Sequence, residues 1–131
     1  MIYLDTCAFV KLLWSEPETA ALQHFLTERS GQRLVSSELL ALEVRRAVLR
    51  TAAVGMARAD LLLTRVDRVA LTGGIVEAAS RIPDPHLRSA DAIHLATALA
   101  LGTELASFVT YDKRLVSAAE QNHLPVIIPA D

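Results

Sequence analysis

Short apolar runs alternate with stretches of helical periodicity along the whole chain. The apolar runs predict strands, and Gly, Pro, Ser or Asp residues separate them from the helical stretches. Strands alternating with helices are typical of an α/β protein whose parallel sheet is covered by helices on both faces. We expect strands at Ile2–Leu4, Arg33–Ser36, Val69–Leu71, Phe108–Thr110 and Val126–Ile128.

The helical stretches lie between these runs. A cap at Ser36 or Ser37 is expected to begin the longest helix, which runs to about Val54. Gly73-Gly74 predicts a turn after the third strand, and Ser89 predicts the cap of an apolar helix that Gly102 ends. Further helices are expected at 7–14, 18–29, 57–68, 75–81 and 113–121. No repeat or linker interrupts the pattern, so we expect one domain over residues 1–131.

Composition narrows the class of protein. With 52% hydrophobic and 21% charged residues, the chain is typical of a globular domain. No apolar run approaches the roughly 20 residues of a membrane span, and an acid at position 5 argues against a secretory signal. The single cysteine, Cys7, cannot form an internal disulfide. We therefore expect a cytoplasmic protein.

Two acids follow predicted strands directly. Asp5 comes after the first strand and Asp112 closely follows the fourth, each before a predicted helix. Either acid alone could be a helix cap. The carboxyl ends of parallel strands are also where such sheets bind ligands, and neighbouring strands would bring both acids to one edge.

Two more acids lie on predicted helices. Asp91 stands in the first turn of a helix that is apolar nearly all round, so it is expected to face the interior or a cleft. Glu43 lies beside a leucine stripe, where an ion pair with Arg46 three residues later is a sound alternative to a role in chemistry. Clustered carboxylates favour a hard cation such as Mg²⁺ or Mn²⁺.

Other chemistry receives less support from the sequence. The histidines lack the spacing of zinc ligands, and His94, three residues after Asp91, is better explained as a hydrogen-bonded packing residue. Cys7 is a weak candidate nucleophile, since nearby acids would raise its pKa. A receiver-like binding module is a further alternative, but the region 69–74 holds no acid to accept a phosphoryl group.

Four segments of the chain resemble the motifs of PIN-domain nucleases, most closely the VapC-type toxins of bacterial toxin–antitoxin pairs. The resemblance spans Ile2 to Ile128, and D-A-x-H-L-A-T-A followed by T-x-D is specific in combination. Cys7 stands where this family more often has Ser. The segments are L-D-T-C-A-F-V-K-L, S-S-E-L-L-A-L-E-V-R-R-A, R-S-A-D-A-I-H-L-A-T-A and F-V-T-Y-D-K-R-L.

The resemblance implies a three-layer α/β/α fold with a parallel sheet in the order 3-2-1-4-5. It implies that Asp5, Glu43, Asp91 and Asp112 bind one or two Mg²⁺ or Mn²⁺ ions, and that the Thr110 hydroxyl orients a carboxylate or a water. The implied function is that of a metal-dependent endoribonuclease, the toxin of a VapBC-type pair. Its expected partners are RNA and a VapB-type antitoxin. A PIN nuclease of RNA processing is the alternative within the family.

Charge and surface add two expectations. The net charge of −2 comes from 13 basic and 15 acidic residues, so setting four metal-bound acids aside leaves 11 acids and a net charge of +2. Arg46 and Arg50 follow Glu43 on one helical face and could contact RNA phosphates or an antitoxin. A solvated basic face is an equally good interpretation. The leucine-rich helices after Ser37 offer an interface for a homodimer.

Overall fold

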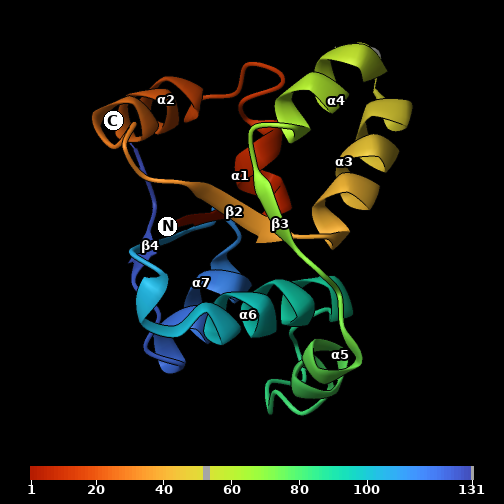
Figure 1. The fold of residues 1–131 in the computed structure, drawn as a ribbon, viewed down its shortest axis with the longest axis vertical. Coiled ribbons are helices and arrows are strands. Elements are labelled where there is room, and N and C mark those ends of the chain that lie inside the picture. Colours follow the sequence, from red (N-terminus) through yellow and green to blue (C-terminus); the bar gives the residue numbers. More distant parts are fainter. Residues whose placement is uncertain (52–53, 131) are drawn as a thin grey trace.

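Five parallel strands form the sheet of the computed structural model, which describes residues 1–51 and 54–130 (Figure 1). Their order is β3-β2-β1-β4-β5, so the expected order 3-2-1-4-5 is confirmed. The central strand pairs with β2 on one side and with β4 on the other. The strands are β1 (Ile2–Leu4), β2 (Leu34–Ser37), β3 (Asp67–Val69), β4 (Ser107–Val109) and β5 (Val126–Ile127).

Helices cover both faces of this sheet. They are α1 (Thr6–Val10), α2 (Thr19–Glu28), α3 (Leu39–Arg50), α4 (Met56–Leu63), α5 (Gly73–Ser80), α6 (Ser89–Leu101) and α7 (Lys113–Gln121), with a 3-10 turn at Gly102–Glu104. Figure 1 shows α1 to α4 on one face, α6 and α7 on the other, and α5 beside α6. This is the expected three-layer α/β/α arrangement. Within residues 1–51 and 54–130, no helix combines the length and apolar content that crossing a membrane requires.

Burial on both faces explains why β1 occupies the centre of the sheet. Ile2, Tyr3 and Leu4 are all fully buried. Side chains alternate along a strand, so Tyr3 packs with Phe108 on one face while Ile2 and Leu4 pack with Leu22 on the other. An unbroken apolar run is the sequence that such a strand needs.

The third strand lies two residues earlier than the predicted Val69–Leu71. Asp67 pairs in register with Val35, and Arg68 with Ser36. Because β3 is the edge strand of the sheet, its charged side chains remain exposed to solvent. The predicted bounds of β3 were wrong because they followed an apolar run, and an edge strand does not need apolar residues.

Two helix starts also differ from the prediction. Gly73-Gly74 begins α5 and does not form a separate turn, because the Thr72 hydroxyl caps the helix by accepting the Ile75 N–H at 3.2 Å. Ser89 is not a cap: α6 begins at Ser89 itself, and Arg88 holds the cap position without a side-chain hydrogen bond.

The two serines at the end of β2 have separate roles. Ser37 supplies the cap of α3, because its Oγ accepts the Leu39 N–H at 3.1 Å. Ser36 is fully buried, and its Oγ donates to the Leu4 carbonyl at 2.6 Å, which ties β2 to β1. The helix ends at Arg50, short of the prediction, and residues 52–53 of that prediction lie outside the described residues.

Candidate active site

Asp5 and Asp112 stand beyond the carboxyl ends of two paired strands, β1 and β4. Both are also helix caps. Asp5 accepts the Ala8 N–H at 2.9 Å at the start of α1, and Asp112 accepts the Arg114 N–H at 2.9 Å at the start of α7. From the sequence, a helix cap and a site residue at the edge of the sheet were alternative roles for each acid. In the structure, each acid is a cap and also lies at that edge. Capping fixes each carboxylate at the edge of the sheet.

Asp5 is the most enclosed of the four predicted acids. It is only 3% exposed, and the Thr110 hydroxyl donates to one of its oxygens at 2.5 Å. Burial raises the pKa of Asp5 above its ordinary value, and hydrogen bonds from Thr110, Cys7 and the Ala8 N–H oppose that rise only in part. An ionised Asp5 is therefore costly without a cation beside it. The contact with Thr110 fits the orienting role implied for this threonine.

Cys7 lies against the same carboxylate. Its Sγ donates to both Asp5 oxygens at 3.1 Å. Burial and the charge of Asp5 raise the pKa of the thiol to about 12, so Cys7 is a protonated donor near neutral pH. Its weakness as a nucleophile, expected from the sequence, is confirmed.

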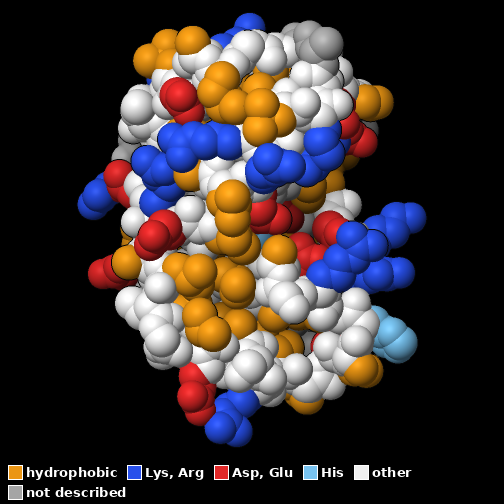
Figure 2. All heavy atoms as spheres, turned by 90° about the vertical axis from the view of Figure 1, so that its right-hand side faces the viewer, with side chains coloured by type: hydrophobic (Ala, Val, Ile, Leu, Met, Phe, Trp, Pro, Cys, Tyr) orange, Lys and Arg blue, Asp and Glu red, His pale blue; other side chains and the backbone are white. Residues whose placement is uncertain are grey.

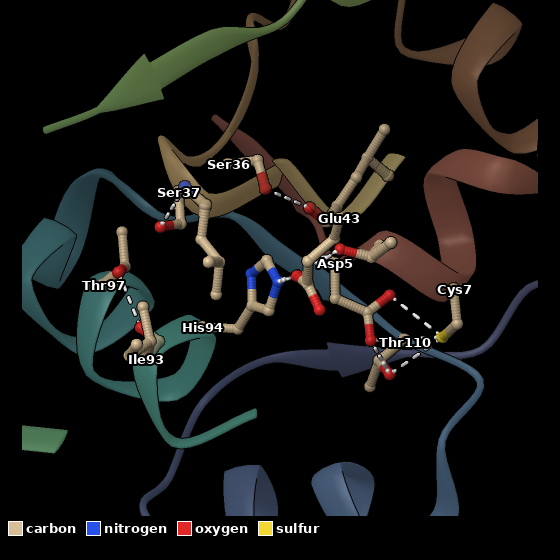
Figure 3. Close-up of polar contacts among 12 residues, drawn as sticks. Asp5, Cys7, Ser36, Ser37, Glu43, Ile93, His94, Thr97 and Thr110 are labelled. Carbon is tan, nitrogen blue, oxygen red and sulfur yellow. Dashed lines mark hydrogen bonds and ion pairs between the residues drawn. The ribbon is translucent and has the colours of Figure 1, made fainter. Parts of the chain in front are cut away.

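Glu43 reaches the site from α3, but not through the ion pair considered above. Its Oε1 accepts hydrogen bonds from Thr6 Oγ1 at 2.6 Å and from His94 Nε2 at 2.7 Å (Figure 3). Partial burial acts to raise the pKa of Glu43, but the hydrogen bonds from His94 and Thr6 act against it, and the pKa is lowered. Within residues 1–51 and 54–130, Arg46 makes no ion pair with Glu43. The alternative pairing is therefore wrong.

His94 is the residue whose part in the site the sequence did not reveal. It lies on α6, only 1% exposed, and its Nδ1 contacts the Tyr3 hydroxyl at 2.7 Å. The expected hydrogen-bonded packing residue is confirmed, but one of its partners is Glu43. The sequence feature that could have indicated His94 as a site residue is its position three residues after Asp91, which puts both side chains on one side of the helix.

Asp91 occupies the first turn of α6 and is partly exposed. Burial and the charges of Asp112 and Asp5, with a smaller contribution from Glu43, raise its pKa to about 6. It shares with Asp112 a cavity of about 270 Å³ that is also lined by Arg88, Lys113 and Arg114. The expectation that Asp91 faces a cleft is confirmed. The other three predicted acids thus all lie close enough to oppose the ionisation of Asp91.

The donor chemistry of these acids fits a hard divalent cation, which binds oxygen ligands and would neutralise their mutual repulsion. The four carboxylates do not converge on a single point, however. Within the described residues, no three His, Cys, Asp or Glu side chains are grouped closely enough to hold an ion. Direct ligation by fewer than three side chains fits a cation that keeps several of its waters, as Mg²⁺ does.

Comparisons with known sequences identify the family of the chain. Residues 2–121 match the family model described as PIN domain. Ribonuclease VapC35 of Mycobacterium tuberculosis (strain ATCC 25618 / H37Rv) is 42% identical, with 98% of this chain and 97% of the relative covered. Ribonuclease VapC47 of Mycobacterium tuberculosis (strain CDC 1551 / Oshkosh) is 45% identical, with 92% and 91% covered.

Two solved structures share the fold. A chain of VapBC2 from Rickettsia felis, solved with a DNA fragment from the promoter, aligns with a TM-score of 0.76 at 15% identity, over 98% of both chains. A chain of FitAB bound to the IR36 DNA fragment aligns with a TM-score of 0.67 at 18% identity, over 98% of this chain and 95% of that chain. These two structures share the fold, and the sequence matches show that the protein belongs to the PIN domain family, in its VapC group.

Proposed function

We propose that the protein is a metal-dependent endoribonuclease that hydrolyses RNA phosphodiester bonds at the four-acid cluster (Asp5, Glu43, Asp91 and Asp112). The observation that carries this proposal is the cavity that Asp91 and Asp112 line together, where the charges of Asp112, Asp5 and Glu43 all contribute to the raised pKa of Asp91. Grouped carboxylates weaken a fold when they are ionised, and such perturbed groups cluster at functional sites. The relatives named ribonucleases support the choice of RNA as substrate.

The four-acid cluster would hold one or two Mg²⁺ or Mn²⁺ ions, with Asp5 and Asp91 as the first ligands. When bound, such a cation supplies positive charge against the phosphate and makes a neighbouring water more acidic. The preference for oxygen ligands follows from the four carboxylates, since Cys7 is protonated and His94 is fully engaged by Tyr3 and Glu43.

The chain's own residues orient the groups that react. Thr110 donates to Asp5 and so fixes the direction in which that carboxylate presents its other oxygen. Asp112 or Glu43 accepts a proton from the attacking water. Glu43 suits this role because hydrogen bonds from His94 and Thr6 keep its pKa low and the carboxylate ionised.

Basic side chains beside the four-acid cluster would contact the RNA backbone. Arg88, Lys113 and Arg114 line the cavity that Asp91 and Asp112 share. In Figure 2, Lys and Arg side chains gather next to acidic ones on this side of the molecule. None of the three basic residues has an ion-pair partner among residues 1–51 and 54–130. Each is therefore free to bind a phosphate.

Replacing Arg88 by Gln should weaken RNA binding several-fold and reduce the salt dependence of binding by about one counterion. The measurement is fluorescence anisotropy of a labelled RNA at several salt concentrations, on an Asp5→Asn background that prevents cutting. The matched control is Arg81→Gln, since Arg81 pairs with Glu77 on the surface of α5. If the RNA affinity of the two variants depends on salt concentration to the same degree, Arg88 does not contact the RNA backbone.

The proposed activity is tested by incubating the purified protein with total RNA in the presence of Mg²⁺, Mn²⁺ or EDTA. We expect discrete cleavage products with either cation and none with EDTA, and mapping of the cut ends would identify the target. If no RNA is cleaved under any of these conditions, the enzyme assignment fails.

In the cell, the protein would act as the toxin of a VapBC-type pair. The VapC names of its relatives and the VapBC2 structure support this role. We expect expression of the chain alone to arrest growth, and co-expression of an antitoxin from a neighbouring small reading frame to restore it. Arg46 and Arg50 on α3 are exposed and could bind either the antitoxin or RNA. Their replacement by Gln would distinguish these partners, because only one of the two affinities should fall.

A homodimer would bury the leucines of α3 and α4. Leu42, Leu49 and Leu61 are 60%, 65% and 63% exposed in the single chain, which is unusual for such large apolar side chains. Leu49→Glu should therefore convert a dimer to a monomer in size-exclusion chromatography with light scattering. The control Ile128→Glu, at an apolar residue that is 48% exposed beyond β5, should leave the mass unchanged. A wild-type protein that is monomeric at all concentrations would contradict this assembly.

A further inference from the structure

A buried chain of hydrogen bonds connects the core of the sheet to the four-acid cluster. It begins at Tyr3 on β1, which is fully buried, passes through the imidazole of His94 and ends on Oε1 of Glu43. The two links are each 2.7 Å long. Thr6 joins at the far end, 2.6 Å from the same Glu43 oxygen and 3.3 Å from His94 Nε2. Figure 3 shows the His94 ring reaching the Glu43 carboxylate, with Asp5 beside it.

With a neutral imidazole ring, only one arrangement of donors and acceptors satisfies both links of this chain. A protonated tyrosine hydroxyl donates to Nδ1 of His94, which leaves the ring proton on Nε2. The Nε2–H then donates to the carboxylate of Glu43, which can only accept. The ring cannot turn over without breaking both bonds, because it is only 1% exposed and packed inside the protein. The direction of the Nε2–H bond is therefore fixed by the core.

The hydrogen bonds to Glu43 distinguish its two carboxylate oxygens. Oε1 accepts from both Thr6 and His94, whereas Oε2 has no hydrogen-bond partner among residues 1–51 and 54–130. The Glu43 side chain is 28% exposed, so it lies at the surface of the site and not in the closed core. A carboxylate held by one oxygen in this way presents the other in a defined direction.

We propose that His94, held in its tautomer by Tyr3, is a positioning residue that orients Glu43 so that Oε2 faces the cation and the RNA. This inference rests on the proposed function, because it gives Glu43 its task in the four-acid cluster. Hydrogen-bonding partners of metal ligands typically change metal affinity or activity by 10- to 100-fold when they are removed. The same hydrogen bond also explains why a histidine is buried beside alanines and leucines on α6.

The test compares His94→Gln with His94→Asn. The Gln amide can place a donor near the position of Nε2, whereas the shorter Asn amide lies near Nδ1 and cannot reach Glu43. We expect His94→Asn to lose about 10- to 100-fold in kcat with little change in KM, and to bind Mn²⁺ about 10-fold more weakly. His94→Gln should recover most of both losses. Ala96→Gly, at a buried residue of α6 that packs with Ala79 of α5, controls for disturbance of the helix.

A second pair of variants avoids the buried core altogether. Thr6 is partly exposed, so Thr6→Val removes a donor to Glu43 at little cost to folding, and Thr6→Ser keeps the donor. We expect Thr6→Val to lose several-fold in kcat and Thr6→Ser to stay near wild type. This pair decides the question if the His94 variants do not fold.

The ring nitrogens of His94 provide a readout that does not depend on activity. In ¹⁵N NMR of the metal-free protein, we expect a neutral ring protonated on Nε2, and a mixture of tautomers in Tyr3→Phe. Wild-type Mn²⁺ affinity in both His94→Asn and Thr6→Val, or a ring protonated on Nδ1, would overturn the inference. If wild-type protein cleaves no RNA, the function has failed, and Mn²⁺ binding and the tautomer still test the positioning of Glu43.

Discussion

Cleavage of RNA by the Asp5→Asn variant should fall by about a thousandfold or more, with the fold intact. Asp5 is the buried acid at the end of the central strand, and removing its charge takes away a principal cation ligand. Asn is an equally good helix cap, so α1 should still begin at Thr6. The Asn amide can also continue to hydrogen-bond the Thr110 hydroxyl. Activity should therefore be lost without a comparable loss of stability.

Cleavage rates at saturating Mg²⁺ and thermal unfolding of the same samples check this expectation. The matched control is Asp67→Asn, which removes an exposed acid from β3 at its ion pair with Arg33. That variant should cut RNA at the wild-type rate. An Asp5→Asn protein that is folded and fully active would show that Asp5 is a helix cap only.

Asp91→Asn should make the metal-free protein more stable above about pH 6, although it abolishes cleavage. The pKa of Asp91 is raised from 3.8 to about 6 in the folded protein by burial and by neighbouring carboxylates. A raised pKa means that the folded state holds the proton more tightly than the unfolded state. The stability that this gives is complete below about pH 4 and is lost as the pH rises through 6.

The ionised carboxylate therefore weakens the fold at neutral pH, and Asn removes that penalty. The full shift would correspond to about 3 kcal/mol, but Asp91 is partly exposed and screened by solvent, so we expect about 1 kcal/mol. For a chain of this size that is about 3–5 °C in Tm.

Thermal unfolding of both proteins between pH 4 and pH 8 in EDTA measures the effect. The difference in Tm should be near zero at pH 4 and reach its plateau above pH 6. Adding Mn²⁺ should raise the Tm of the wild type and reverse the order of the two proteins. A difference in Tm that does not vary with pH would show that Asp91 does not titrate in this range.

The sequence predicted the structure correctly where a single local feature, such as an apolar run or an acid between a strand and a helix, determines it. The apolar run at Ile2–Leu4 can only be a strand buried on both faces, and Asp5 and Asp112 were recognisable because each stands between a strand and a helix. The family motifs supplied the strand order, which no local pattern contains. Edge strand β3 was misplaced because its position depends on pairing with β2 and not on its own hydrophobicity.

The contacts within the site were harder to foresee than its members. For Glu43, an ion pair with Arg46 was the alternative to a role in the site, because i,i+3 neighbours on a helix can meet. The actual partner, His94, is 51 residues away in sequence and becomes a neighbour only when α3 and α6 meet at the edge of the sheet. The same holds for Tyr3, whose apolar surroundings predicted burial but whose hydroxyl partner lies 91 residues further along the chain. Such pairings are products of the tertiary fold.

The position of β1 has a consequence for how this protein is made. Of the five strands of this sheet, the central one is synthesised first, and it is paired on both sides only after residues 107–109 have been synthesised. The acids at the edge of that strand come together later still, because Asp112 follows β4. A nascent chain that stops before Asp112 therefore lacks a complete set of carboxylates. Synthesis therefore has to pass Asp112 before the four acids can come together.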